Sequence, residues 1–130
     1  AVNILYTHSW LIYRINNVLS KFDLTPQQFN LLRILRGQYP SPASISLIKE
    51  RMLDKMSDAS RLVDRLIQKK LVERKICSQD RRKVDVIITR KGLKLLEKID
   101  AQNEELDSYL KNLSETEAKK LNHLLDKLRG

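Results

Sequence analysis

The side chains with the clearest chemical meaning are cations that recur at short, regular spacings. Arg61 and Arg65 are four residues apart in a helical pattern, so both project from one face of that helix. Arg81, Arg82 and Lys83 stand together in a polar stretch between two β-branched segments. A guanidinium can donate two hydrogen bonds to the major-groove edge of guanine, and it can also enter a narrow minor groove. Both clusters therefore indicate contact with a polyanion.

Each cluster also has a plainer interpretation. On the helix, Asp64 could form exposed ion pairs with Arg61 or Arg65, and exposed pairs contribute little. In the turn, a basic run could simply be solvated and blunt the edge of a sheet. Asp80 could there hold one of the neighbouring arginines in place. The charge of the whole chain helps to choose between polyanion contact and these plainer interpretations.

The charge balance favours a polyanionic partner. The 130 residues include 25 Lys and Arg against 16 Asp and Glu, a formal net charge of +9 with a pI near 9.8. Residues 49–91 carry 14 basic and 7 acidic side chains, a net of +7. The excess thus lies where the arginine clusters lie. This favours nucleic acid as the partner, with an anionic membrane surface as the second choice.

Composition also excludes several classes. The single Cys77 cannot form an internal disulfide, no apolar run is long enough to span a membrane, and no signal peptide is visible. We expect a cytoplasmic protein of one domain. His8, His123 and Cys77 lack metal-ligand spacing, and there is no phosphate-binding glycine loop or nucleophile–base pair. We expect no metal, no cofactor and no enzymatic activity. Neighbouring cations could make Cys77 reactive, or it could be a passive residue at a strand end.

The elements that position the arginines are mainly helical. Thr25-Pro26-Gln27-Gln28 and Ser114-Glu115-Thr116-Glu117 are capping boxes, and Ser44 can cap a short helix. Apolar residues recur at helical spacing over residues 3–20, 26–36, 44–52, 56–67, 93–110 and 115–128. The two helices at 44–52 and 56–67 are separated by a few residues, which predicts a helix-turn-helix.

The period then changes from helical to alternating. Residues 72–76 alternate, with Val72, Arg74 and Ile76 on one face, and residues 84–89 are rich in β-branched side chains. Together they predict a β-hairpin with a basic tip at 78–83. A helix-turn-helix followed by a basic hairpin is a winged helix, so the predicted fold class is mainly α with a small β-hairpin wing. Its second helix can enter the major groove, while the wing reaches an adjacent groove or the backbone.

Four stretches resemble the MarR (multiple-antibiotic-resistance regulator) family of bacterial transcription regulators. They are SRLVDRL at residues 60–66, KLVER at 70–74, DRR at 80–82 and ITRKG at 88–92. Their order and spacing match together, and the flanking helices fit, so the resemblance covers nearly the whole chain. One position departs from the family: Lys70 stands where a glycine is usual between the recognition helix and the strand. Lysine suits a left-handed helix cap less well than glycine. The substitution therefore concerns the local geometry of this turn and not the fold.

The resemblance implies a homodimeric winged helix that binds double-stranded DNA and represses, or less often activates, genes near its own. The single domain 1–130 would contain the winged helix-turn-helix at 25–91 and dimerisation helices at 1–22 and 92–130. Two-fold symmetry then predicts a pseudo-palindromic operator with half-sites about one helical turn apart. Asp80 and Arg81 match the family's wing pair, whose arginine reaches the minor groove.

These considerations give two sets of candidate DNA contacts. The recognition helix would use Ser57, Asp58, Ser60, Arg61 and Arg65, where the short hydroxyls fit phosphates or base edges. The wing would use Asp80, Arg81, Arg82 and Lys83.

The resemblance also implies a small aromatic or lipophilic effector that releases the DNA. Its pocket could be lined by Tyr6, Trp10, Tyr13, Phe29 and Leu32, or these residues could be interhelical core. An alternative function is a winged helix that binds another protein, with an incidental basic face. Salt dependence separates the two functions, since phosphate contacts release counterions.

Overall fold

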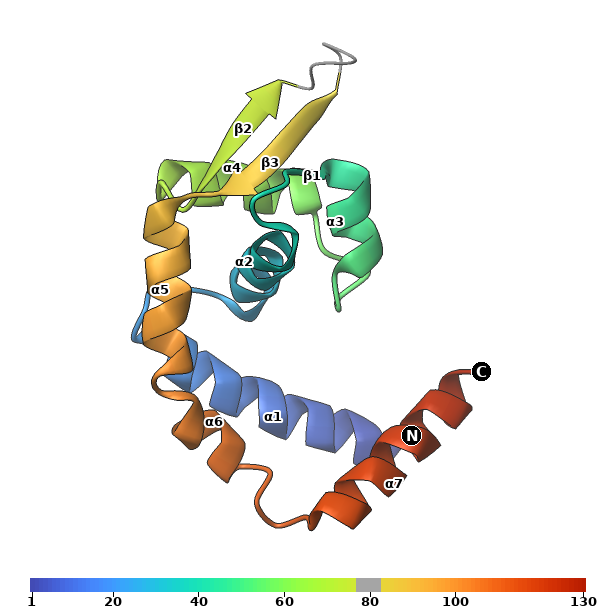
Figure 1. The fold of residues 1–130 in the computed structure, drawn as a ribbon. Coiled ribbons are helices and arrows are strands. Elements are labelled where there is room, and N and C mark those ends of the chain that lie inside the picture. Colours follow the sequence, from blue (N-terminus) through green and yellow to red (C-terminus); the bar gives the residue numbers. More distant parts are fainter. Residues whose placement is uncertain (77–82) are drawn as a thin grey trace.

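The computed structural model describes residues 1–76 and 83–130, which form helices and one small sheet whose hairpin projects at one end of the molecule (Figure 1). In chain order the elements are α1 (Val2–Ser20), α2 (Pro26–Gln38), β1 (Ala43–Ser44), α3 (Ile45–Arg51), α4 (Ala59–Gln68), β2 (Val72–Ile76), β3 (Val84–Ile88), α5 (Arg90–Asp100), α6 (Asn103–Ser108) and α7 (Glu115–Arg129). The wing strands lie at one end of the molecule, and α1, α6 and α7 lie at the other (Figure 1). No described helix has the length and hydropathy needed to cross a bilayer.

Both predicted capping boxes are confirmed. The Thr25 hydroxyl accepts a hydrogen bond from the Gln28 N–H, and Gln28 Oε1 accepts one from the Thr25 N–H, each at 3.2 Å. Ser114 and Glu117 repeat this exchange at the start of α7, at 3.2 and 2.8 Å. The Ser114 backbone N–H, and then its hydroxyl, hold the pKa of Glu117 below its usual range. The depressed native pKa means that this cap stabilises α7 at neutral pH and weakens as the pH falls through that pKa.

The sheet contains the predicted hairpin and one strand more. β2 and β3 pair antiparallel with Val72 opposite Ile88 and Ile76 opposite Val84. The unpredicted strand β1 pairs with the other edge of β3, giving the order β1-β3-β2. Two residues are too few to show an alternating pattern in a sequence, so only the tertiary pairing identifies β1. Ser44 ends this strand and caps α3, as predicted, by accepting from the Leu47 N–H at 3.1 Å.

One hydrophobic core joins the winged lobe to the end of α1. Fully or nearly fully buried side chains come from α1, α2, α3, α4, the sheet and α5, and include Leu19, Leu31, Leu32, Leu35, Ile48, Met52, Val63, Leu66, Val86, Ile88, Leu96 and Ile99. The buried residues of α1 are confined to its last turn, at Val18 and Leu19. The rest of α1 therefore presents apolar side chains that this single chain leaves exposed.

Two helix boundaries differ from the prediction. The periodic run 93–110 is two helices, because Gln102 leaves the helical region with φ −106° and ψ 12°. The apolar spacing continues across this break, so periodicity did not reveal it. The recognition helix α4 starts at Ala59, later than the predicted position 56, because the Asp58 carboxylate accepts from the Arg61 N–H at 3.1 Å and caps the helix there. Met56 and Ser57 consequently lie in the turn before α4.

The departure at Lys70 is a left-handed helix cap. Lys70 has φ +61°, its N–H donates to the Ile67 carbonyl at 2.9 Å, and the Leu71 N–H donates to the Leu66 carbonyl at 3.0 Å. These two bonds define a Schellman motif, in which glycine usually occupies the left-handed position. The fold therefore keeps the geometry of the turn and accepts a strained lysine.

We expect Lys70→Gly to stabilise the protein by about 0.5–1 kcal/mol, because relief of the left-handed strain outweighs the greater freedom of glycine in the unfolded chain. The melting temperature should rise by roughly 2–4 °C. Lys70→Ala is the matched control: it removes the same charge and keeps the Cβ, so it should not raise the melting temperature. Equal melting temperatures for the glycine and alanine variants would contradict the strain argument.

Candidate nucleic-acid interface

The helix α4 buries one face and exposes the other. Ala59, Val63 and Leu66 are buried against the lobe. Every candidate contact within or capping the helix is on the opposite, exposed side: Asp58, Ser60, Arg61 and Arg65. The sequence predicted this division, and the structure places the four side chains together on the solvent-facing surface of one helix.

Asp64 is paired with the wing and not with its neighbours on α4. Its carboxylate forms an ion pair with the guanidinium of Arg74 on β2. The alternative in which Asp64 holds Arg61 or Arg65 is therefore not the arrangement in the structure. Neither arginine has an ion-pair partner in the described ranges 1–76 and 83–130. Two guanidinium groups are thus available to an external anion.

The carboxyl end of α4 is fixed to two neighbouring segments, the turn before α2 and the amino end of α5. The Lys69 ammonium donates to the Asp23 carbonyl and lies 3.4 Å from the Asp23 carboxylate. The Lys69 carbonyl accepts from the Lys91 ammonium at 3.0 Å, and the Lys70 carbonyl accepts from the Thr89 hydroxyl at 2.8 Å. These bonds set the position of the recognition helix relative to α2 and α5.

A groove of about 300 Å³ runs between the amino end of α2 and α4. Most of the residues that line it are polar or charged, and they comprise Thr25, Gln27, Gln28, Asp54, Met56, Ser57, Asp58, Arg61, Leu62 and Arg65. The Ser57 hydroxyl is shielded from solvent and has no hydrogen-bond partner in the part of the chain described. The sequence identified several of these residues on α4. It carried no signal that α2 would contribute to the same surface, because that juxtaposition is tertiary.

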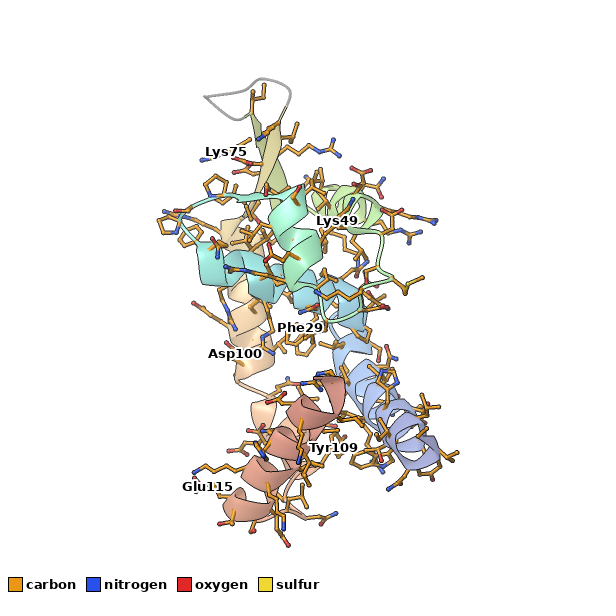
Figure 2. The ribbon with its side chains drawn as sticks, turned by 90° about the vertical axis from the view of Figure 1, so that its right-hand side faces the viewer. Phe29, Lys49, Lys75, Asp100, Tyr109 and Glu115 are labelled. Carbon is orange, nitrogen blue, oxygen red and sulfur yellow. The ribbon has the colours of Figure 1, made fainter. Side chains whose placement is uncertain are left out.

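The wing continues the basic surface beyond α4. Arg74, Lys75 and Lys83 are exposed on its strands and at its described edge. Figure 2 shows Lys75 on the wing and Lys49 on α3, both in the half of the molecule opposite Glu115. Four candidate residues, Cys77, Asp80, Arg81 and Arg82, lie outside the described residues. Their roles stay predictions.

Two of the aromatic residues proposed to line an effector pocket each lie beside an arginine. They are Trp10 on α1, near the end of α6, and Phe29 on α2. The Trp10 ring packs edge-on against Tyr109, with 6.5 Å between centroids. The Arg14 guanidinium lies 5.4 Å from the centre of Trp10 and 4.9 Å from that of Tyr109. Arg33 lies 5.6 Å over Phe29 on α2. Cation–π contacts of this kind hold aromatic rings in place.

The other three candidates differ in burial. Leu32 is fully buried in the core, whereas Tyr6 and Tyr13 are 73% and 66% exposed. None of the five candidates lines the groove beside α4 or a second groove, of about 360 Å³, on the basic face of α5. Neither of these two grooves brings the five candidates together, and the effector pocket stays a prediction. Among the described residues, no three His, Cys, Asp or Glu side chains form a group that could hold a metal ion.

Comparison with known sequences finds one family and several curated relatives. The model of the MarR family matches residues 24–84. The HTH-type transcriptional repressor MdtR of Bacillus subtilis is 32% identical over 111 residues, which are 85% of this chain and 70% of the relative. The HTH-type transcriptional regulator MhqR of the same organism is 31% identical over 114 residues, 87% of this chain and 77% of the relative.

Comparison with solved structures finds the same architecture. A mutant MarR from E. coli complexed with operator DNA superposes with a TM-score of 0.86 at 28% identity, covering 96% of this chain and 89% of that one. The S. aureus MepR–DNA complex gives 0.81 at 25% identity, covering 98% and 93%. BpsR of Bordetella bronchiseptica, whose DNA binding is regulated by 6-hydroxynicotinic acid, shares the fold with a TM-score of 0.84 at 24% identity, covering 99% and 93%.

Proposed function

The chain belongs to the MarR family of DNA-binding transcription regulators, and on that basis we propose that it is a homodimeric repressor of a pseudo-palindromic operator. Each α4 would enter the major groove of one half-site, as in other winged helices. The observation that carries this proposal is the exposed face of α4, where Arg61 and Arg65 lack ion-pair partners in the described part of the chain. Such a face suits base edges and phosphates.

The proposed contacts follow from this placement. Arg61, near the amino end of α4, would read a base edge, and Asp58, Ser60 and Arg65 would contact the flanking base edges or phosphates. Ser57 would join them only after a movement of the turn before α4, since its hydroxyl is shielded from solvent in the free chain. The wing would contact the adjacent minor groove or backbone through Asp80, Arg81, Arg82 and Lys83. The net charge of +7 over residues 49–91 would strengthen binding to any DNA and make it dependent on salt.

The dimer is supported by apolar faces that one chain leaves uncovered. No residue of α7 is buried, yet Leu121, Leu124 and Leu128 fall on one side of it. On α1, Leu5 and Tyr6 are also largely exposed. Exposed apolar surface of this extent is typical of an interface. The helices α1 and α7 lie at the same end of the molecule, away from the wing (Figure 1), so a second copy bound at that end would leave α4 free.

We expect Leu124→Glu to dissociate the proposed dimer. Burial of a leucine side chain contributes about 2 kcal/mol, and two-fold symmetry counts it twice, so the dimer constant should weaken roughly a thousandfold. Sedimentation velocity over a range of concentrations measures this. His123→Glu places the same carboxylate on the opposite face of α7 and should leave the dimer intact. A dimer equally stable in both variants would exclude α7 from the interface.

We further propose that a small aromatic or lipophilic effector releases the DNA. The regulation of BpsR by 6-hydroxynicotinic acid provides a precedent in a protein of the same fold. Tyr6, Trp10, Tyr13, Phe29 and Leu32 are the residues proposed to contact the effector. Because Tyr6 and Tyr13 are exposed in the single chain, the second protomer would have to complete their environment.

The proposal is tested by fluorescence anisotropy with the DNA upstream of the protein's own gene and a scrambled duplex of equal length. We expect a preference of about a hundredfold or more for the upstream DNA, within the range of specific regulators. Affinity for both duplexes should fall steeply between two salt concentrations. Equal, salt-sensitive binding would call for selection from a random pool. Absence of binding to any DNA would favour the protein-interaction alternative.

A further inference from the structure

The turn before the recognition helix exposes a methionine that has no packing role in the free protein. Met56 is 92% exposed. It is an apolar side chain in a groove beside α4 that is lined mostly by polar or charged residues. Asp54 orders the turn by accepting two hydrogen bonds: its carboxylate accepts from the Met56 N–H at 2.9 Å, and its carbonyl accepts from the Ser57 N–H at 3.2 Å. These bonds therefore fix the backbone at Met56, and its exposed side chain projects from a defined place on the surface.

This place is next to the proposed base-reading arginine. Met56 lies two residues before Asp58, which caps α4, and it shares the lining of one groove with Arg61 and Arg65. Side chains at the amino end of a recognition helix are those that reach base edges in the major groove. A duplex seated against Arg61 would therefore also meet the turn that carries Met56.

The major groove offers one apolar group to such a side chain. Its other edge groups are hydrogen-bond donors and acceptors, whereas thymine carries a C5 methyl group. Methionine is unbranched and polarizable, so it adapts to an apolar contact of irregular shape. We propose that Met56 contacts the C5 methyl group of a thymine in each half-site of the operator and thereby sets a preference for thymine at that position. The inference rests on the proposed docking of α4 in the major groove.

A matched control is present in the same turn. Leu53 is 84% exposed, but it is not part of the groove lining, and its N–H is bound to the Asn30 side chain at 2.9 Å. Leu53→Ala removes an apolar side chain of similar exposure at a position that we do not place against DNA. Because both side chains are exposed, neither alanine variant should lower the melting temperature appreciably.

The test compares operator duplexes in which thymines are replaced one at a time by deoxyuridine, which lacks only the methyl group. At one thymine per half-site, we expect the loss of the methyl to weaken wild-type binding about fourfold, the effect of one buried carbon. Met56→Ala should bind the unmodified operator more weakly and show no further loss at that thymine. Leu53→Ala should reproduce the wild-type profile at every position.

The outcomes separate this inference from the function on which it rests. Identical deoxyuridine profiles for wild type and Met56→Ala would overturn the thymine contact while leaving operator binding intact. A uniform weakening of all duplexes by Met56→Ala would also overturn it, since that result indicates contact with the sugar-phosphate backbone. Failure of the wild-type protein to prefer any operator would overturn the docking of α4, and the thymine contact with it.

Discussion

Replacement of Gly92 by alanine is expected to destabilise the protein by about 3 kcal/mol, the upper part of the range for overpacking a core. A Cβ at this position would lie 2.4 Å from the Leu71 carbonyl oxygen and 2.7 Å from Cγ1 of Ile88. The oxygen cannot simply move away, because it accepts from the Thr89 N–H at 3.0 Å. The amino end of α5 therefore packs directly on the turn that follows the recognition helix.

Urea unfolding followed by circular dichroism measures this effect as a shift in the midpoint. Gly37→Ala is the matched control, since among the described residues no atom beyond its chain neighbours and its own helix backbone lies within 4 Å of the Cβ that it would add on α2. Alanine should stabilise that helical position by about 0.5–1 kcal/mol. Equal shifts of the midpoint in the same direction for both variants would contradict the prediction. They would show that close packing does not require glycine at position 92.

Arg61→Ala is expected to weaken operator binding by about 4 kcal/mol, or roughly a thousandfold, without unfolding the protein. A bidentate arginine–guanine contact contributes about 1–3 kcal/mol, and a two-fold symmetric complex contains two of them. The side chain is exposed and unpaired within the described residues, so its removal leaves the core untouched. Anisotropy titrations with operator and scrambled duplexes give both the affinity and the specificity ratio.

Two further variants identify what Arg61 reads. Arg61→Lys keeps the charge but loses the planar fork, so it should retain binding to scrambled DNA and lose most of the preference for the operator. Arg129→Ala, at the opposite end of the molecule, removes the same side chain from an exposed ion pair with Asp126 and should leave both affinities unchanged. If Arg61→Lys kept the full specificity ratio, Arg61 would be a phosphate contact and another side chain would read the base.

The sequence by itself determined the two capping boxes, the buried face of α4, the paired strands of the wing and the charge of the binding surface. Thr25 with Gln28 and Ser114 with Glu117 form their capping boxes from residues three positions apart, so a short stretch contains both partners. The apolar spacing of α4 likewise dictates which of its faces is buried and leaves Arg61 on the other. These features depend on local hydrogen bonds and on helical period, and both are legible in a linear chain.

Only the tertiary structure decided which partners these local features have. Asp64 could pair with two neighbouring arginines on its own helix, yet it pairs with Arg74 on β2, because the fold brings that strand against α4. The strand β1, the close approach behind Gly92 and the groove shared by α2 and α4 likewise join segments far apart in sequence. Spacing in a sequence fixes the direction of a side chain along its own element. Which atoms it meets depends on how elements pack, and that is a property of the folded chain.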